Sequence, residues 1–290
     1  MSKLFDETKK AQQWTIAPNK VQDVRGLDVG QLLENIEYPE IVREVAPAEP
    51  VKESRTALLV KGDSPVAIAG ETSSVAAVES YRALRTRLIN RQTVKSFKSI
   101  MITSAVPGEG KTLTALNLAL CFSQLPNTRV LLVDADVRSR GLSHFFGNPE
   151  TAGVSEVLSG EVTPDDAVQA TEHKNLYVVT AGANIAKSSS AEQFAGPHWR
   201  EFMARSTEAY SLVVVDSPPV LAVADSEMIG AGCDGLLVIV RALHTNREVL
   251  QRLAGSIDKS KLLGIVYNGM PDGIMSRHHY GYGYGSAGKK

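Results

Sequence analysis

The chain has 290 residues, 43% of them hydrophobic, which is enough to bury one substantial core and a small appendage. Its formal net charge of −1 gives no support to nonspecific nucleic-acid binding, a function that normally requires a basic surface. No apolar run approaches the roughly 18 to 20 residues of a membrane helix and no signal peptide is recognisable, so the sequence predicts a cytoplasmic protein.

The first 70 residues are polar with short apolar patches, and they predict a loosely ordered N-terminal arm that ends in a linker. A helix is predicted from Ser74 to Gln92, with Ser73 or Ser74 as its cap. Its apolar stripe consists of Val75, Val78, Tyr81, Leu84 and Leu88.

The next two elements are a strand and a helix joined by a glycine-rich loop. Residues 99–103 predict a buried strand, and apolar residues at helical spacing follow Lys111. The loop between them reads Pro107-Gly-Glu-Gly-Lys-Thr112 and fits G-x-x-x-x-G-K-[ST], apart from an alanine at the first glycine position. Such a loop holds nucleotide phosphates with its backbone amides and its lysine, and Mg²⁺ with its threonine hydroxyl. The predicted nucleotide-binding residues are Pro107, Gly108, Glu109, Gly110, Lys111, Thr112 and Leu113.

The remaining strands are predicted from continuous apolar runs, which are typical of strands covered on both faces. With helical segments between them, they indicate an α/β fold with a mainly parallel twisted sheet and helices on both faces. The continuous apolar runs are 100–102, 130–133, 176–179, 212–215, 235–240 and 262–266.

The two cysteines, Cys121 and Cys233, lie in apolar segments without metal-ligand spacing and predict buried thiols.

Acidic residues follow two of these runs. Asp134 and Asp136 come after residues 130–133 and, two positions apart, point to the same side of an extended chain. Asp216 follows residues 212–215, before a pair of prolines. An isolated Asp after a strand is usually a turn or cap residue, but carboxylates beside a phosphate loop indicate a magnesium site. The predicted metal ligands are Thr112, Asp134 and Asp216.

The end of the chain, residues 271–290, is predicted to be a mobile tail that contributes nothing to the core. Its tyrosines, Tyr280, Tyr282 and Tyr284, are separated by single glycines, so that each phenol can be exposed.

Taken in order, these motifs resemble those of the bacterial tyrosine kinases that control polysaccharide synthesis and export, relatives of the MinD and ParA ATPases in the P-loop class. The resemblance covers about residues 74–270 and the tail, and places the kinase domain at 71–270. It implies an ATP- and Mg²⁺-dependent autokinase in which Lys111 and Thr112 belong to the Walker A motif. Asp134 and Asp136 then belong to Walker A′ and Asp216 to Walker B, with Asp134 as the expected acceptor of the tyrosine proton. The implied catalytic residues are Lys111, Asp134, Asp136 and Asp216.

The same resemblance implies how the chain assembles. Glu79, Arg82 and Arg85 match a family motif that joins subunits into a ring, although such spacing in isolation indicates a solvated, self-paired helix face. The tail tyrosines are then phosphoacceptors, modified by a neighbouring subunit. The implied partner is a separate membrane-spanning chain-length regulator, which activates the kinase through a cytoplasmic peptide and holds it at the inner membrane.

Two other functions are open from the sequence. One is a MinD- or ParA-like ATPase that acts as a positioning switch, although the loop 104–109 lacks the second lysine usual in those proteins. The other is a binding module that holds nucleotide without turnover. The chain also departs from its relatives at residues 138–143, which lack a proline and a histidine, and at 183–192, which lack a proline-rich turn.

Overall fold

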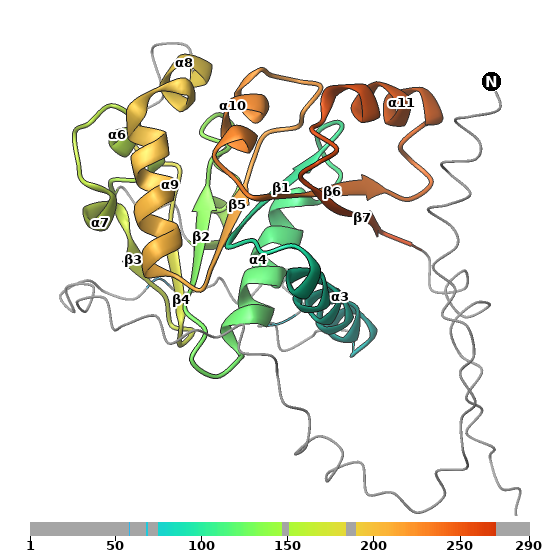
Figure 1. Ribbon diagram of the computed structural model, residues 1–290, viewed down its shortest axis with the longest axis horizontal. Helices are drawn as coiled ribbons and strands as arrows, with labels where there is room; N and C mark the ends of the chain where they lie inside the picture. Colours follow the sequence, from blue (N-terminus) through green and yellow to red (C-terminus); the bar gives the residue numbers. More distant parts are fainter. Residues whose placement is uncertain (1–57, 59–67, 69–74, 147–150, 184–189, 271–290) are drawn as a thin grey trace, which may run out of the picture. The chain divides into compact units, whose positions relative to one another are not determined.

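The computed structural model describes residues 58, 68, 75–146, 151–183 and 190–270, and within these ranges the apolar runs form one seven-stranded sheet (Figure 1). The strands are β1 (Ser99–Ser104), β2 (Val130–Asp134), β3 (Gln169–Ala170), β4 (Leu176–Val179), β5 (Leu212–Asp216), β6 (Gly235–Arg241) and β7 (Leu262–Asn268). Their order is β3-β4-β2-β5-β1-β6-β7, and only β3 runs antiparallel to its neighbour. The six predicted strands and the mainly parallel sheet are confirmed.

Of the described helices, α3 precedes β1 and the others lie in the connections between strands. The long ones are α3 (Val75–Val94), α4 (Lys111–Ser123), α9 (Pro197–Ala209) and α11 (Arg247–Ser256). The short ones are α5 (Ser143–Phe146), α6 (Val154–Leu158), α7 (Pro164–Ala167), α8 (Ser190–Ala195) and α10 (Asp225–Ala231).

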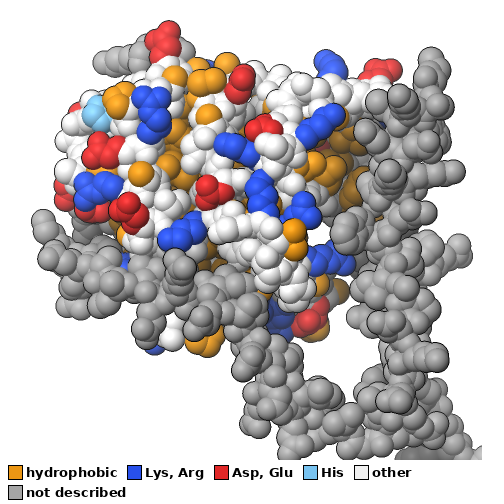
Figure 2. Space-filling view, viewed as in Figure 1, with side chains coloured by type: hydrophobic (Ala, Val, Ile, Leu, Met, Phe, Trp, Pro, Cys, Tyr) orange, Lys and Arg blue, Asp and Glu red, His pale blue; other side chains and the backbone are white. Residues whose placement is uncertain are grey.

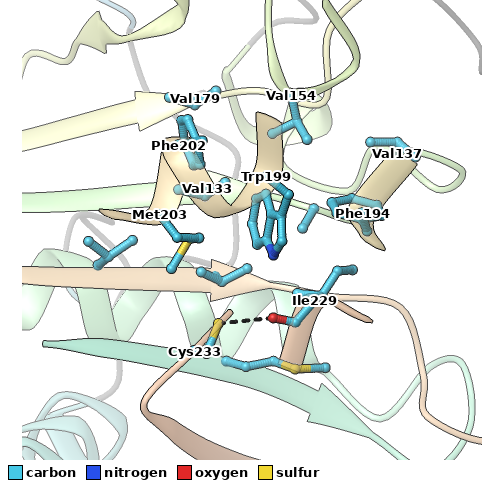
Figure 3. Packing of buried hydrophobic residues seen from close by; sticks show 14 of the residues in the cluster. Val133, Val137, Val154, Val179, Phe194, Trp199, Phe202, Met203, Ile229 and Cys233 are labelled. Atoms are coloured by element: carbon cyan, nitrogen blue, oxygen red, sulfur yellow. Dashed lines mark hydrogen bonds between the residues drawn. The ribbon is translucent and has the colours of Figure 1, made fainter. Parts of the chain in front are cut away.

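The sheet has a separate apolar core on each face. On one face, side chains from α6, α8, α9 and α10 pack on the sheet around Trp199, whose ring stacks on Phe202 and meets Phe194 edge-on (Figure 3). On the other face, α4 packs directly on the strands, and α3 covers α4 through the buried Leu88. Both cysteines are buried and free, as predicted.

Two details of the predicted elements are wrong. Val75 is 78% exposed, so the apolar stripe of α3 does not include its first residue; packing is concentrated near Leu84 and Leu88. The last strand is not covered on both faces, because β7 is an edge strand and leaves Ile265 and Tyr267 at least half exposed. The two-residue strand β3 was not predicted, since a run so short carries no pattern.

Two residues of the predicted arm are described, and both contact the folded domain. Leu58 forms a parallel bridge with Thr171 at the β3 edge of the sheet. The backbone N–H of Ile68 donates to Oδ1 of Asn117 in α4 at 3.0 Å. The other residues of 1–70, the helix caps Ser73 and Ser74, and the tail 271–290 lie outside the described residues.

The order of the strands determines where the motifs meet. The three central neighbours are β2, β5 and β1, so the loops that follow these strands lie together at the carboxyl edge of the sheet. The glycine-rich loop follows β1, while Asp134 and Asp216 end β2 and β5 as paired neighbours in the register.

Candidate functional site

The glycine-rich loop owes its shape to two glycines. Gly108 and Gly110 have φ values of +82° and +91°, in the left-handed region that favours glycine. A Cβ on Gly110 would also lie 2.1 Å from Nδ2 of Asn268, so both conformation and space require glycine there. Gly110 precedes α4 and makes no side-chain cap. The first-turn N–H groups of α4 therefore form the kind of helix start that binds anions.

Lys111, the first residue of α4, forms an ion pair across the site. Its Nζ lies 3.1 Å from Oδ2 of Asp136, and both side chains are largely buried. The other oxygen of Asp136 accepts a hydrogen bond from the backbone N–H of Ser139 at 3.1 Å. The segment that follows β2 is thereby attached to the glycine-rich loop.

Asp134 lies deeper in the same segment and has no solvent exposure. Its Oδ1 accepts from the N–H of Asp136 at 3.2 Å and its Oδ2 from the N–H of Leu142 at 3.0 Å. Burial raises the pKa of Asp134 well above its ordinary value, and the negative charge of Asp216 adds to this effect. In this arrangement Asp134 holds the chain from 136 to 142 in place.

Asp216 is the least satisfied charged group of the site. Neither of its carboxylate oxygens has a hydrogen-bond partner among the described residues, although both are buried. Burial raises the pKa of Asp216 to about 7, while the charge of Lys111 and the hydroxyl of Thr112 act in the opposite direction. Buried carboxylates normally form direct hydrogen bonds, so two oxygens that form none beside Lys111 and Thr112 indicate that a ligand completes the site.

Thr112 lies where the two loops meet. A Cβ on Gly141 would come within 2.8 Å of the Thr112 hydroxyl, so the segment after β2 passes directly against it. Together with Asp216, this hydroxyl provides oxygen donors of the kind that Mg²⁺ prefers. No group of three or more His, Cys, Asp or Glu side chains suited to a metal occurs in the described part of the chain. A magnesium ion that arrives with nucleotide needs only one or two carboxylates, so the residues present fit it.

A second charged cluster, which was not predicted from the sequence, anchors the segment that follows β2. Nε of Arg138 lies 3.1 Å from the buried Asp225 at the start of α10, and Nη2 of Arg138 donates to the Ser190 hydroxyl of α8 at 2.9 Å. The Ser190 hydroxyl also hydrogen-bonds Asp225. Two helices that are remote in the sequence thus fix the arginine of the segment that carries Asp134 and Asp136.

The three charges predicted for assembly do not act as one group. Arg82 pairs with Glu79 at 2.7 Å, with both side chains at least half exposed. Arg85 instead donates from Nη1 to the carbonyl oxygen of Cys121 in the last turn of α4, at 2.6 Å. One of the three therefore joins α3 to α4 within the subunit, and two form a pair in solvent.

The structure thus brings Lys111, Thr112, Asp134, Asp136 and Asp216 together at one edge of the sheet. The predicted acceptors Tyr280, Tyr282 and Tyr284 lie outside the described residues.

On the face seen in Figure 2, acidic and basic side chains are interspersed. No helix within the described ranges is long and apolar enough to cross a membrane.

Comparisons with known proteins agree on the family. Residues 97–262 match a family described as an AAA domain. The tyrosine-protein kinase YwqD of Bacillus subtilis is 37% identical over 211 residues, which cover 72% of this chain and 86% of YwqD. The tyrosine-protein kinase CpsD of Streptococcus pneumoniae is 30% identical over 74% of this chain and 93% of CpsD.

Solved structures show the same fold. The kinase domain of the Escherichia coli tyrosine kinase ETK superposes with a TM-score of 0.62 at 29% identity, covering 72% of this chain and 80% of that domain. The septum site-determining protein MinD of Pyrococcus horikoshii, solved with Mg-ADP, has a TM-score of 0.51 at 20% identity, covering 62% of this chain and 76% of MinD. The second likeness shows a shared fold alone.

Proposed function

The chain belongs to the bacterial tyrosine-protein kinases, and we propose that it transfers the γ-phosphoryl group of Mg-ATP to tyrosines in the tail of a second copy. One observation carries the assignment of the site. Both carboxylate oxygens of Asp216 are buried and form no direct hydrogen bond with a described residue, and they lie beside Lys111 and Thr112, at the start of a helix that favours anions. A magnesium nucleotide satisfies both features at once.

The glycine-rich loop and Lys111 bind the phosphates in this proposal. The N–H groups from Gly108 to Leu113 provide the donors, and the Lys111 ammonium provides a charge-assisted contact. Lys111 also pairs with Asp136. A phosphate would therefore compete with Asp136 for the Lys111 ammonium.

Thr112 and Asp216 are the proposed ligands of the magnesium ion, and Asp134 lies beside Asp216 on the neighbouring strand. The bound ion would neutralise charge on the phosphates, which is the main requirement of phosphoryl transfer. Asp216 must lose its proton to bind a cation, and its pKa of about 7 places that change near neutral pH. The affinity for Mg²⁺ is therefore expected to rise as the pH increases through 7.

Asp134 is the proposed acceptor of the tyrosine proton. Its raised pKa makes it a better base than an ordinary carboxylate. Asp136 is the alternative, because it faces Lys111 directly. Asp134 accepts hydrogen bonds from backbone N–H groups, whereas Asp136 pairs with Lys111. The asparagine variants of the two residues therefore show which of them accepts the tyrosine proton.

Assembly and partners complete the proposal. Glu79 and Arg82 are free to contact a neighbouring subunit in a ring, and Arg85 positions the helix that carries them. Phosphorylation adds about −1.5 to −2 charges to each tyrosine. The tail then becomes an anion, is repelled by the neighbour's phosphates and is released. We place this cycle in polysaccharide assembly, beside a membrane-bound regulator whose cytoplasmic peptide activates the kinase.

The test uses two full-length variants. Lys111→Met protein with its tail intact is mixed with active protein in which Tyr280, Tyr282 and Tyr284 are replaced by phenylalanine, and both are incubated with labelled Mg-ATP. Label on tyrosines of the Lys111→Met chain is expected. An unlabelled chain would exclude transfer between subunits. Release of free phosphate without phosphotyrosine in the wild type would favour the positioning ATPase instead.

A further inference from the structure

Glu109 is a buried carboxylate within the phosphate loop that the proposed chemistry does not use. The residue is 2% exposed, although it stands between Gly108 and Gly110. A negative charge beside a phosphate site opposes the binding of a nucleotide. Its presence therefore requires a reason other than contact with phosphate.

Partners from three parts of the chain surround Glu109. Its Oε2 accepts from the N–H of Val106 at 3.0 Å, at the start of the loop. Its Oε1 accepts from the N–H of Arg241, the last residue of β6, at 3.3 Å and from the hydroxyl of Thr245 in the loop before α11. Its main-chain oxygen accepts from Nδ2 of Asn268 at 2.9 Å, at the end of β7.

These bonds fix the loop from both ends. The Val106 contact ties Glu109 back to the second residue after β1, and Nδ2 of Asn268 lies so close to Gly110 that a Cβ there would displace the Asn268 side chain. Nη1 of Arg241 also donates to the carbonyl oxygen of Gly108 at 3.2 Å. The carbonyl oxygens of Gly108 and Glu109 are thereby held by side chains outside the loop.

We propose that Glu109 is a positioning residue. Its carboxylate, together with Thr245 and Asn268, holds the phosphate loop in the conformation that binds nucleotide, and the carboxylate does not contact the nucleotide. This inference rests on the proposed nucleotide binding. A loop already fixed in its binding shape loses less conformational entropy when the phosphates arrive. The negative charge is tolerated because three donors satisfy it on the side where it is buried.

The test compares three full-length variants by their affinity for Mg-ADP. Glu109→Gln replaces one acceptor oxygen by an amide donor and should raise the Kd about 10-fold. Thr245→Val removes one donor to the same carboxylate and should raise the Kd about 3-fold. The control is Glu248→Gln in the first turn of α11, which removes the same charge from a side chain exposed to solvent.

The double variant Glu109→Gln/Thr245→Val distinguishes positioning from direct contact. A shared hydrogen-bond network predicts that its Kd rises by less than the product of the two single effects. The KM for ATP should rise in parallel, with kcat changed less than twofold at saturating ATP. Independent effects, or an unchanged Kd for Thr245→Val alone, would mean that Glu109 acts on the nucleotide directly.

Two further outcomes are decisive. If Glu109→Gln lowers the stability to unfolding by denaturant while the Kd stays constant, the residue is only structural and the inference is wrong. If the wild type binds no Mg-ADP, the proposed function fails and the inference falls with it. A wild type that binds, with variants that bind equally well, overturns the inference alone.

Discussion

Charged side chains are held differently at the carboxyl edge of the sheet and on α3. At the edge, Asp134, Asp136 and Asp216 have at most 1% exposure, and Asp216 has no hydrogen-bond partner among the described residues. On α3, Glu79 and Arg82 form a pair at 2.7 Å with both side chains at least half exposed. Water stabilises the second set, whereas only the protein or a ligand can stabilise the first.

The difference in burial indicates which charged groups have a ligand. Buried carboxylates that lack partners destabilise the fold, so they are expected where a ligand supplies the missing charge. Exposed pairs contribute little energy and by themselves point to no ligand. Substitutions at the two regions should therefore differ in size and in what they change.

The largest effect is expected for Lys111→Met. Tyrosine phosphorylation should fall at least 100-fold, because the charge-assisted contact to phosphate is lost. The change also leaves Asp136 without its ion-pair partner, which should lower the free energy of unfolding by about 1–3 kcal/mol. Phosphotyrosine labelling and denaturant unfolding measure the two effects.

Two variants control the Lys111 result. Lys259→Met, on the exposed surface before β7, should leave activity and stability unchanged. The double variant Lys111→Met/Asp136→Asn should recover stability without recovering activity, because it removes the unpaired charge. A fully active Lys111→Met protein would remove the basis for the site.

Next in size is the comparison of Asp134→Asn with Asp136→Asn. If Asp134 accepts the tyrosine proton, Asp134→Asn should slow transfer by about 10²- to 10⁴-fold. Its Kd for nucleotide should change by only a few fold. Single-turnover transfer and nucleotide titration give the two values. Equal losses of binding and transfer would contradict the base role, and a selective loss in Asp136→Asn would assign it to Asp136.

The pH dependence of stability tests the buried edge without any ligand. The pKa of Asp216 is raised from 3.8 to about 7, so between these values the folded protein holds a proton that the unfolded chain has released. Stability from this group is therefore complete below about pH 4 and is lost as the pH rises through 7. The slope is at most about 1.4 kcal/mol per pH unit.

Asp216→Asn removes the titrating group, and denaturant unfolding at several pH values measures the change in slope. The difference between wild type and variant should be flat above about pH 8. Saturating Mg-ADP should also reduce the wild-type slope near pH 7, since a bound cation keeps Asp216 ionised. Identical slopes in the two proteins would mean that the Asp216 carboxyl is not buried in the nucleotide-free protein.

The smallest effects are expected on α3. Arg85→Ala breaks the hydrogen bond to the carbonyl oxygen of Cys121 and should cost about 1–2 kcal/mol. Glu79→Ala and Arg82→Ala should each cost less than about 0.5 kcal/mol in the monomer. If the Glu79 and Arg82 side chains face a neighbouring subunit, the same two variants should lower the mass measured by light scattering. An unchanged mass would leave them as a solvated pair.

Most of the fold could be predicted from the sequence, because continuous apolar runs are typical of strands covered on both faces and so favour a parallel sheet. β3 and the exposed face of β7 could not be predicted. A two-residue strand has no periodicity, and the edge position of β7 depends on the order of strands rather than on its own residues.

Local patterns in the sequence are enough to predict which groups reach the site. Glycines at positions 108 and 110, a lysine at the start of a helix and acids at two strand ends are local patterns, and each follows from the conformation of a few residues. How these groups are held depends on contacts between distant parts of the chain. Glu109, read from the sequence as a nucleotide contact, is held by Thr245 and Asn268, more than 130 residues away. The packing of the strands brings Thr245 and Asn268 to Glu109, and no local sequence pattern predicts these contacts.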